Sequence, residues 1–170
     1  MSDQVLVTGV TGYIGQHCGA ELLRQGYEVL GTIRSLEKAE VVREGIAKVA
    51  PIEKLAFVEA DLTKDEGWRE AMADCKYVLH VASPFIIADP DDENEIISPA
   101  VDGTLRVLSA AKSAGIERTV VTSSLIAIIA GKQSGHYGTE SWSDPEAEIG
   151  TYAKSKVLAE KAAWSYAEEN

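Results

Sequence analysis

A tyrosine and a lysine four positions apart carry the clearest chemistry in this sequence. Tyr152 and Lys156 lie in the stretch Tyr-Ala-Lys-Ser-Lys, where helical spacing places both side chains on one face. A phenol exchanges protons poorly at neutral pH because its ordinary pKa is about 10, and a neighbouring cation stabilises the phenolate. Such a pair can therefore pass a proton to or from a substrate oxygen. The spacing alone also fits an ordinary exposed helix, so other motifs must support a catalytic interpretation.

A glycine-rich turn near the N-terminus supplies that support. Residues 8–15, Thr-Gly-Val-Thr-Gly-Tyr-Ile-Gly, follow the apolar run 5–7 and precede a helical pattern. A strand, turn and helix start of this kind direct backbone N–H groups and the positive helix end at an anion, typically a dinucleotide pyrophosphate. The first glycine allows the tight turn, the second the close approach of phosphate, and the third the packing of helix on strand. The residues expected to bind the cofactor here are Gly9, Thr11, Gly12, Tyr13, Ile14 and Gly15.

The residues after the second expected strand indicate which dinucleotide is bound. In a dinucleotide-binding fold an acidic residue there binds the ribose 2′-hydroxyl of NAD. Residues 31–35, Gly-Thr-Ile-Arg-Ser, contain no carboxylate and put Arg34 at that place. A guanidinium suits a 2′-phosphate through bidentate hydrogen bonds, and Lys38 can add charge. An exposed arginine at a strand end is the alternative interpretation. The sequence favours NADP, with NAD less favoured.

Short apolar runs alternate with amphipathic segments along the whole chain. We expect strands at residues 5–8, 27–33, 55–59, 77–82 and 118–122, and helices at 13–25, 36–49, 63–73, 93–114 and 150–168. Thr63-Lys64-Asp65-Glu66 has the form of a capping box, and Asp144-Pro145 that of a helix-opening pair. The alternation predicts an α/β fold, a doubly wound parallel sheet of the Rossmann type. We expect residues 1–170 to form one dinucleotide-binding domain.

The composition narrows the class of partner. The chain has 16 Lys and Arg against 27 Asp and Glu, a net charge of −11, which argues against a nucleic-acid partner and an acidic membrane surface. No apolar run reaches membrane-spanning length, and the first strand begins too early to leave room for a signal peptide. Cys18 and Cys75 fit reduced packing residues, and the histidines do not cluster with other metal ligands. We expect a cytoplasmic protein without a metal.

The motifs together resemble a known superfamily. The Gly-x-x-Gly-x-x-Gly spacing with Tyr-x-x-x-Lys resembles the extended branch of the short-chain dehydrogenases/reductases, within the NAD(P)-dependent epimerase/dehydratase superfamily. The run Val-Leu-His-Val-Ala-Ser-Pro-Phe at 78–85, Thr-Ser-Ser at 122–124 and residues 152–156 resemble its dihydroflavonol-4-reductase-like group. The resemblance covers the whole chain but only the front half of the family's architecture, so the substrate domain is expected to be absent from it.

The resemblance implies roles for individual residues. Ser124, with Ser123 as second choice, positions the substrate carbonyl; Tyr152 donates the proton, and Lys156 assists it and holds the nicotinamide ribose. On the cofactor side, Asp61 bonds the adenine amino group and Leu62 gives a backbone contact, although Asp61 also fits a plain loop residue. The small residues Ala82 and Ser83 let ribose and phosphate pass close to the end of the fourth strand.

The implied activity is that of an NADP-dependent reductase: hydride transfer from the reduced nicotinamide to the carbonyl carbon of a small ketone or aldehyde. A nucleotide-sugar epimerase uses the same Ser, Tyr and Lys chemistry and is one alternative. A non-catalytic dinucleotide-binding protein, or a truncated inactive fragment, is another, and we expect this chain alone to turn over weakly or not at all. The helices at 101–111 and 152–166 match those by which extended family members dimerise, so a homodimer is also implied.

Overall fold

A parallel sheet forms the centre of the fold. The structure, a computed structural model, describes residues 3–84 and 90–170. Within them the strands are β1 (Gln4–Thr8), β2 (Glu28–Ile33), β3 (Leu55–Glu59), β4 (Tyr77–His80) and β5 (Arg118–Val121), in the order β3-β2-β1-β4-β5. The helices are α1 (Tyr13–Arg24), the 3₁₀ helix η1 (Leu36–Lys38), α2 (Ala39–Ala47), α3 (Trp68–Met72), α4 (Asn94–Ala114), α5 (Ile126–Ile129) and α6 (Thr151–Glu169).

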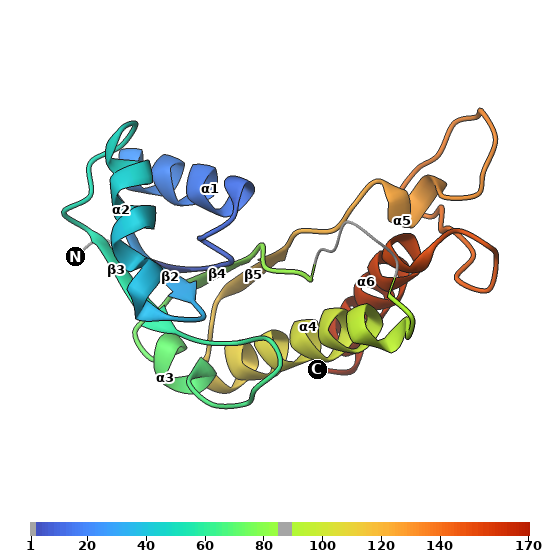
Figure 1. Cartoon of the computed structure of the whole chain (residues 1–170). Helices are drawn as coiled ribbons and strands as arrows, with labels where there is room; N and C mark the ends of the chain where they lie inside the picture. Colours follow the sequence, from blue (N-terminus) through green and yellow to red (C-terminus); the bar gives the residue numbers. More distant parts are fainter. Residues whose placement is uncertain (1–2, 85–89) are drawn as a thin grey trace. The chain divides into compact units, whose positions relative to one another are not determined.

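Alternate residues of β1 face opposite sides of the sheet, and each side has its own core. Val5 and Val7 pack in a cluster with residues of α1 and α2, such as Leu23 and Ile46. Leu6 belongs to a second cluster that contains residues of α3 and α4. Figure 1 shows α1 and α2 on one face of the strands and α3 on the other. The predicted doubly wound α/β fold is thereby confirmed.

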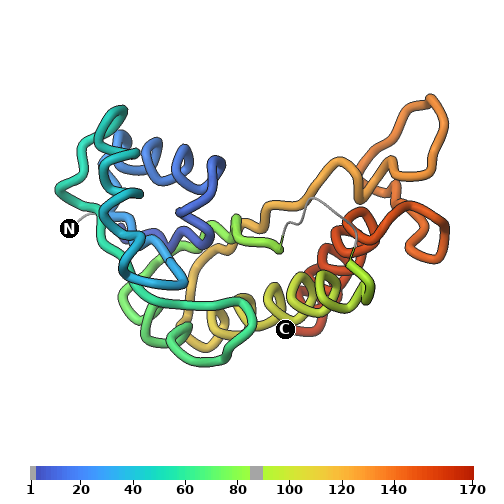
Figure 2. The backbone as a smooth tube through the Cα atoms, in the orientation of Figure 1, coloured from blue at the N-terminus to red at the C-terminus, as the bar shows by residue number. Residues whose placement is uncertain are grey.

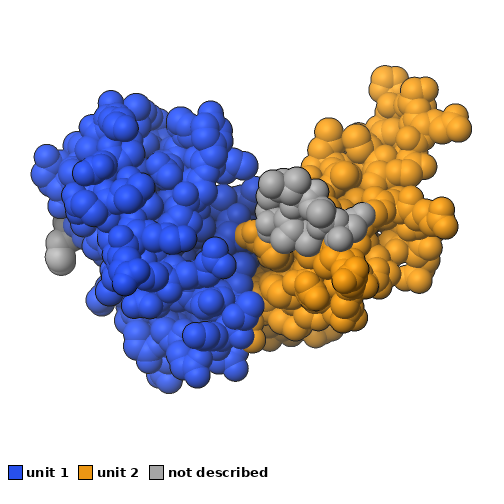
Figure 3. Space-filling view, viewed as in Figure 1, with its two compact units in different colours: residues 1–82, 107–122 blue, residues 83–106, 123–170 orange. Residues whose placement is uncertain are grey.

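Two compact units divide the chain. Unit 1 comprises residues 1–82 and 107–122 and contains the whole sheet, whereas unit 2 comprises residues 83–106 and 123–170 (Figure 3). In unit 2, Ser143 fastens a loop to α5, because its N–H donates to the carbonyl of Ala127 and its hydroxyl to that of Ile126. The expectation of one dinucleotide-binding domain over residues 1–170 stays a prediction.

The expected capping box at residues 63–66 is wrong. The backbone N–H and the hydroxyl of Thr63 both donate to the Asp61 carboxylate, at 2.9 Å each, so Thr63 closes a turn and does not cap a helix. The helix α3 begins five residues later, at Trp68, after Gly67 in a left-handed conformation (φ 85°). The indole of Trp68 donates to the carbonyls of Asp61 and Lys64, which fixes the turn against α3.

The expected helix opening at Asp144-Pro145 is also wrong. The Asp144 carboxylate accepts the N–H of Glu146 at 3.0 Å, and its carbonyl accepts that of Ala147 at 3.2 Å, which makes a local turn. The helix α6 starts at Thr151, after Gly150 with φ 81°. The short helix α5 was not predicted, and the expected helix at 36–49 is divided into η1, capped by Ser35, and α2.

Candidate active site

The glycine turn has the geometry that a phosphate-binding turn requires. Gly9 adopts φ +68°, and its carbonyl accepts the N–H of Gly12 at 3.0 Å, which reverses the chain between β1 and α1 (Figure 2). A Cβ on Gly15 would lie 2.2 Å from the oxygen of Gly9, so only glycine lets the helix pack this closely. Gly9 and Gly15 are therefore used as expected, for the tight turn and for the packing of helix on strand, and the phosphate contact expected of Gly12 stays a prediction.

The N-terminus of α1 is open to solvent. Gly12 occupies the N-cap position and no side chain caps it, and the two residues that follow, Tyr13 and Ile14, are exposed. Thr11 is exposed as well. Uncapped N–H groups at a helix start carry partial positive charge, so this end of α1 suits an anion. The side chain of Tyr13 packs edge-on against His17, with ring centroids 4.5 Å apart.

The turn lies at the point where the order of the strands reverses. The strands β2 and β3 extend the sheet from one side of β1, and β4 and β5 from the other. Ligands of open α/β sheets bind at the carboxyl ends of the strands beside this reversal. Gly9 follows β1 and Ala82 follows β4, and a Cβ on Gly9 would come within 2.8 Å of the Ala82 Cα. Ser83 follows in the chain and is partly exposed; Phe85, which ends the quoted run, lies outside the described residues.

Arg34 and Asp61 are neighbours after β2 and β3. Arg34 and Lys38 are exposed, and Leu62, next to Asp61, is partly buried and contacts the core. The backbone N–H of Thr63 holds the pKa of the Asp61 carboxyl below its usual value, and the charges of Arg34 and Lys64 act in the same direction. The Asp61 carboxylate and the exposed cations Arg34 and Lys64 therefore lie near one another in unit 1. A carboxylate can accept the amino group of adenine, and a guanidinium can bind a 2′-phosphate.

Tyr152 and Lys156 form a close pair on α6. The Nζ of Lys156 lies 5.4 Å from the centroid of the Tyr152 ring. Only 8% of Lys156 is exposed, and this burial lowers the pKa of its ammonium group. The first turn of the helix is held by the Ser155 hydroxyl, which donates to the carbonyl of Tyr152 at 2.7 Å. A desolvated cation beside a phenol is the arrangement that proton transfer requires.

The two serines after β5 have different partners. The Ser123 hydroxyl donates a short hydrogen bond to the carboxylate of Glu160 on α6. The Ser124 hydroxyl oxygen accepts the N–H of Ile126 at 3.4 Å, at the start of α5. That contact uses a lone pair of Ser124, whereas the Ser123 proton is given to Glu160. The geometry thus favours Ser124 over Ser123 as the residue that positions a substrate.

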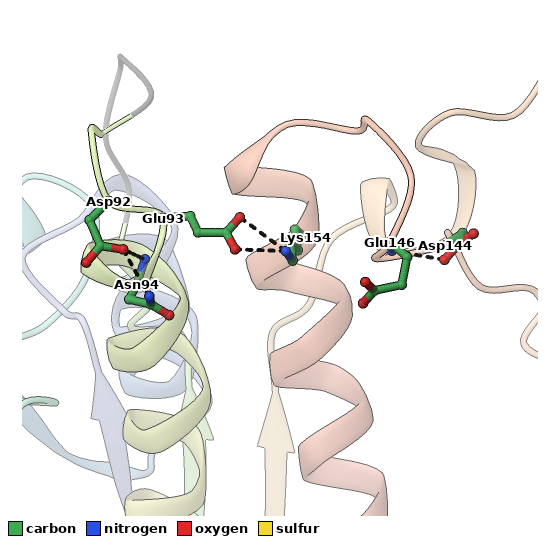
Figure 4. A network of polar contacts seen from close by, with 6 residues as sticks. All are labelled: Asp92, Glu93, Asn94, Asp144, Glu146 and Lys154. Atoms are coloured by element: carbon green, nitrogen blue, oxygen red, sulfur yellow. Dashed lines mark hydrogen bonds and ion pairs between the residues drawn. The ribbon is translucent and has the colours of Figure 1, made fainter.

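Sequence reasoning missed an ion pair beside the Tyr-x-x-x-Lys motif. Lys154, between Tyr152 and Lys156, contacts both carboxylate oxygens of Glu93 at 2.9 and 3.1 Å (Figure 4). The hydrogen bond to Glu93 raises the pKa of Lys154, with a further contribution from the charge of Glu146. No local signal reveals this pair, because its members are 61 positions apart.

The described part of the chain contains neither a cluster of metal ligands nor a helix that could span a membrane. Residues 3–84 and 90–170 hold no group of three or more His, Cys, Asp or Glu that could bind a metal ion. Over the same residues, no helix has the length and apolarity needed to cross a membrane. Both cysteines are free, and burial raises the pKa of the Cys75 thiol to about 11, so it stays protonated.

Comparison with known proteins identifies the family. A dihydroflavonol 4-reductase of Hordeum vulgare is 37% identical over 98% of this chain and 49% of its own length. The crystal structure of yeast methylglyoxal/isovaleraldehyde reductase complexed with NADPH matches with TM-score 0.84 and 34% identity, over 98% of this chain and 53% of that one. Vestitone reductase from alfalfa (Medicago sativa) matches with TM-score 0.79 and 31% identity, over 98% and 53%.

These relatives are all longer than this chain. The chain spans about half the length of the curated relatives and solved structures that it matches. The model of the NAD dependent epimerase/dehydratase family matches residues 5–170, which include the glycine turn, both serines and the Tyr-Lys pair. The chain therefore belongs to the NAD dependent epimerase/dehydratase family.

Proposed function

We propose that this chain carries the cofactor-binding and proton-transferring part of an NADP-dependent reductase that acts on a ketone or aldehyde. The observation that carries the proposal is the buried Lys156 ammonium beside the Tyr152 ring. A lysine with 8% of its surface exposed is costly to desolvate, and such a cost is typical of a functional site. A surface helix with an ordinary ion pair has no reason to bury that charge.

The roles of the residues follow from their chemistry. Tyr152 gives its phenolic proton to the carbonyl oxygen as that oxygen gains negative charge. Lys156 stabilises the phenolate that remains, and its other donors hold the nicotinamide ribose. The Ser124 hydroxyl hydrogen-bonds the carbonyl oxygen and orients it. The nicotinamide supplies the hydride when NADPH is bound. The turn at residues 9–15 and the start of α1 hold the phosphates.

Arg34 supports NADP as the cofactor. It stands after β2 with no carboxylate at residues 31–35, and Lys38 adds a second exposed cation. Asp61, Leu62, Ala82 and Ser83 complete the proposed contacts to adenine and ribose. The yeast reductase, which is 34% identical over almost this whole chain, is described in complex with NADPH.

A carbonyl reductase fits better than the two alternatives. The relatives at 31–37% identity named above are reductases, one of them of methylglyoxal and isovaleraldehyde. A nucleotide-sugar epimerase would use the same Ser124, Tyr152 and Lys156, and a non-catalytic protein would need none of them. For the whole protein we also infer that the substrate is a small carbonyl compound, that the compartment is the cytoplasm and that the oligomeric state is a homodimer.

The test separates cofactor binding from chemistry. NADPH and NADH binding to the 170-residue chain is measured by fluorescence titration. Single-turnover oxidation of NADPH is then followed with aldehydes, diketones and nucleotide sugars, with the protein in excess. We expect NADPH to bind more tightly than NADH and a carbonyl compound to be reduced slowly, within the weak turnover expected of this chain alone. Tyr152→Phe should keep NADPH binding and lose reduction, whereas Tyr137→Phe, on an exposed loop, should change neither. Failure of the parent chain to bind NADPH would overturn the proposal.

A further inference from the structure

The side chain of Thr8 joins the ends of two strands from within the sheet. Its hydroxyl oxygen accepts the backbone N–H groups of Val81 and Ala82, at 3.0 Å each. The same oxygen lies 2.8 Å from Nδ1 of His80, its register partner on β4. Thr8 is fully buried and His80 is 2% exposed. Buried polar atoms at this depth must have their hydrogen bonds satisfied within the protein.

Counting donors and acceptors fixes the direction of the Thr8–His80 bond. A hydroxyl has two lone pairs and one proton, and Val81 and Ala82 already occupy both lone pairs. The remaining hydroxyl proton must therefore go to Nδ1 of His80, which has to be an unprotonated acceptor. His80 is accordingly the neutral tautomer with its proton on Nε2. A donor at Nδ1 would give Thr8 a third incoming N–H and leave its own proton without an acceptor.

The bonded group lies at a tightly packed point of the glycine turn. Gly9 follows Thr8, and there is no room for a Cβ between Gly9 and Ala82, as the 2.8 Å approach to the Ala82 Cα shows. Because the Thr8 oxygen holds the N–H groups of Val81 and Ala82, it sets the spacing between the end of β1 and the end of β4. His80 in turn sets the orientation of that oxygen. The carbonyl of His80 also accepts the N–H of Thr122 at 2.8 Å, which ties β5 to the same point.

We propose that His80 is a positioning residue for the cofactor: as an Nδ1 acceptor it orients the Thr8 hydroxyl, which holds Ala82 at the distance from Gly9 that the dinucleotide needs. The inference rests on the proposed dinucleotide site. It gives a buried histidine a task that neither proton transfer nor substrate contact explains. A histidine that only filled space would not require one particular tautomer.

The first test is spectroscopic and needs no cofactor. Nitrogen-15 NMR of histidine-labelled chain should show His80 as the neutral Nε2–H tautomer. In Thr8→Val, which keeps the shape of the side chain and removes the hydroxyl, this preference should weaken. A protonated Nδ1 in the parent chain would overturn the proposal even if NADPH binds normally.

The second test measures NADPH affinity in matched variants. His80→Leu removes the acceptor, while His80→Asn can place an amide oxygen near the position of Nδ1. We expect His80→Leu and Thr8→Val each to weaken NADPH binding about tenfold, the equivalent of one good hydrogen bond. The double variant should be hardly weaker than either single one, because the two residues act through the same bond. His80→Asn and Thr8→Ser should recover most of the affinity.

The controls separate this inference from the proposed function and from misfolding. Thr104→Val removes another buried hydroxyl, one that donates to the Ala100 carbonyl within α4, and should leave NADPH affinity unchanged. Circular dichroism shows which variants are folded; if His80→Leu is not, the tautomer measurement and Thr8→Val decide. A parent chain that binds NADPH beside a folded His80→Leu of equal affinity would overturn the inference alone. A parent chain that binds no dinucleotide would overturn the proposed function and this role together.

Discussion

Ser123 is held by Glu160, and Ser124 is not. The hydroxyl of Ser123 donates to the Glu160 carboxylate on α6, and that of Ser124 accepts the Ile126 N–H at the longer distance of 3.4 Å. The two adjacent serines thus have different partners, and we predict that Ser124 is the one that presents a proton to a substrate. The sequence alone could rank them only by resemblance.

This difference predicts opposite effects of two alanine variants. Ser124→Ala should slow carbonyl reduction by about 100-fold, the typical loss for one donor to a developing oxyanion, with little change in thermal stability. Ser123→Ala should lower the midpoint of thermal unfolding, because a part-buried Glu160 loses a partner, and should affect reduction less. Single-turnover rates and calorimetry on both variants measure the two effects. A slower reaction in Ser123→Ala than in Ser124→Ala would reverse the assignment.

The choice between NADPH and NADH should depend on Arg34. Arg34→Ala should weaken NADPH binding by about 10-fold to 100-fold, the range for a hydrogen bond to a charged group, and leave NADH binding almost unchanged. Arg69→Ala, which removes an exposed arginine from α3, is the matched control and should alter neither. Isothermal titration with both cofactors gives the affinities. Equal affinity of the parent chain for NADPH and NADH would contradict the prediction.

The glycine turn allows a steric prediction with an internal control. Gly9→Ala combines an unfavourable φ of +68° with a Cβ only 2.8 Å from backbone of Ala82, so cofactor binding should be lost and stability reduced. Gly26 has a similar φ of +89° but open space around it. Gly26→Ala should therefore show only the conformational cost, about 1 kcal/mol, and keep NADPH binding. Urea unfolding and NADPH titration compare the two, and equal losses would argue against close packing at Ala82.

Burial of Lys156 gives the stability of the fold a specific pH dependence. Burial lowers the pKa of Lys156 in the folded chain relative to the unfolded chain. Between those two pKa values the unfolded chain binds more protons, so this residue makes stability rise with pH, by at most about 1.4 kcal/mol per pH unit. Below the folded pKa the charged lysine is a constant cost.

Lys156→Met should remove this contribution. The variant should gain most stability over the parent at neutral pH, and the gain should shrink as the pH rises towards about 10.4, the ordinary lysine value. Urea unfolding at several pH values measures the difference. Lys132→Met, at an exposed position in a loop, is the control variant. A gain that grows with pH would mean that Lys156 is stabilised, not penalised, by its surroundings.

Association through the two long helices is a further prediction. The helix α6 has small residues on one side, Ala159, Ala162 and Ala163, which permit close approach of another helix. Light scattering at high concentration should give a dimer, and Ala163→Glu should shift it towards monomer. Glu169→Ala, at the end of α6, should not. A monomer at every concentration would show that this face of α6 packs only within its own chain.

Some of these features could be read from the sequence because the signals are local. The strand predicted at 55–59 matches β3 residue for residue, because its apolar side chains lie between charged residues, Lys54 on one side and Glu59 and Asp61 on the other. Gly9 and Gly15 have the predicted uses because their spacing reflects backbone geometry. The Tyr152–Lys156 pair is close because i and i+4 always are on a helix.

Other features depend on contacts that a linear pattern does not contain. The capping box failed because the Asp61 carboxylate accepts both donors of Thr63, including the backbone N–H that a capping box would give to the side chain of Glu66. The pair of Lys154 and Glu93 needs the fold to bring its members together. The same holds for Thr8 and His80, which meet only because β1 and β4 are adjacent in the sheet.

The position of Trp68 gives the molecule a built-in optical probe. This tryptophan packs in the core beside the sheet and is 2% exposed, whereas Trp164 on α6 is 59% exposed. The chain has one other tryptophan, Trp142. A buried indole emits at shorter wavelength than a hydrated one, so Trp68 in unit 1 should emit at shorter wavelength than Trp164 in unit 2. Replacing both other tryptophans, Trp142→Phe and Trp164→Phe, would leave Trp68 as the sole tryptophan that emits. Its loss of blue-shifted emission during denaturation would then follow the melting of the sheet separately from that of α6.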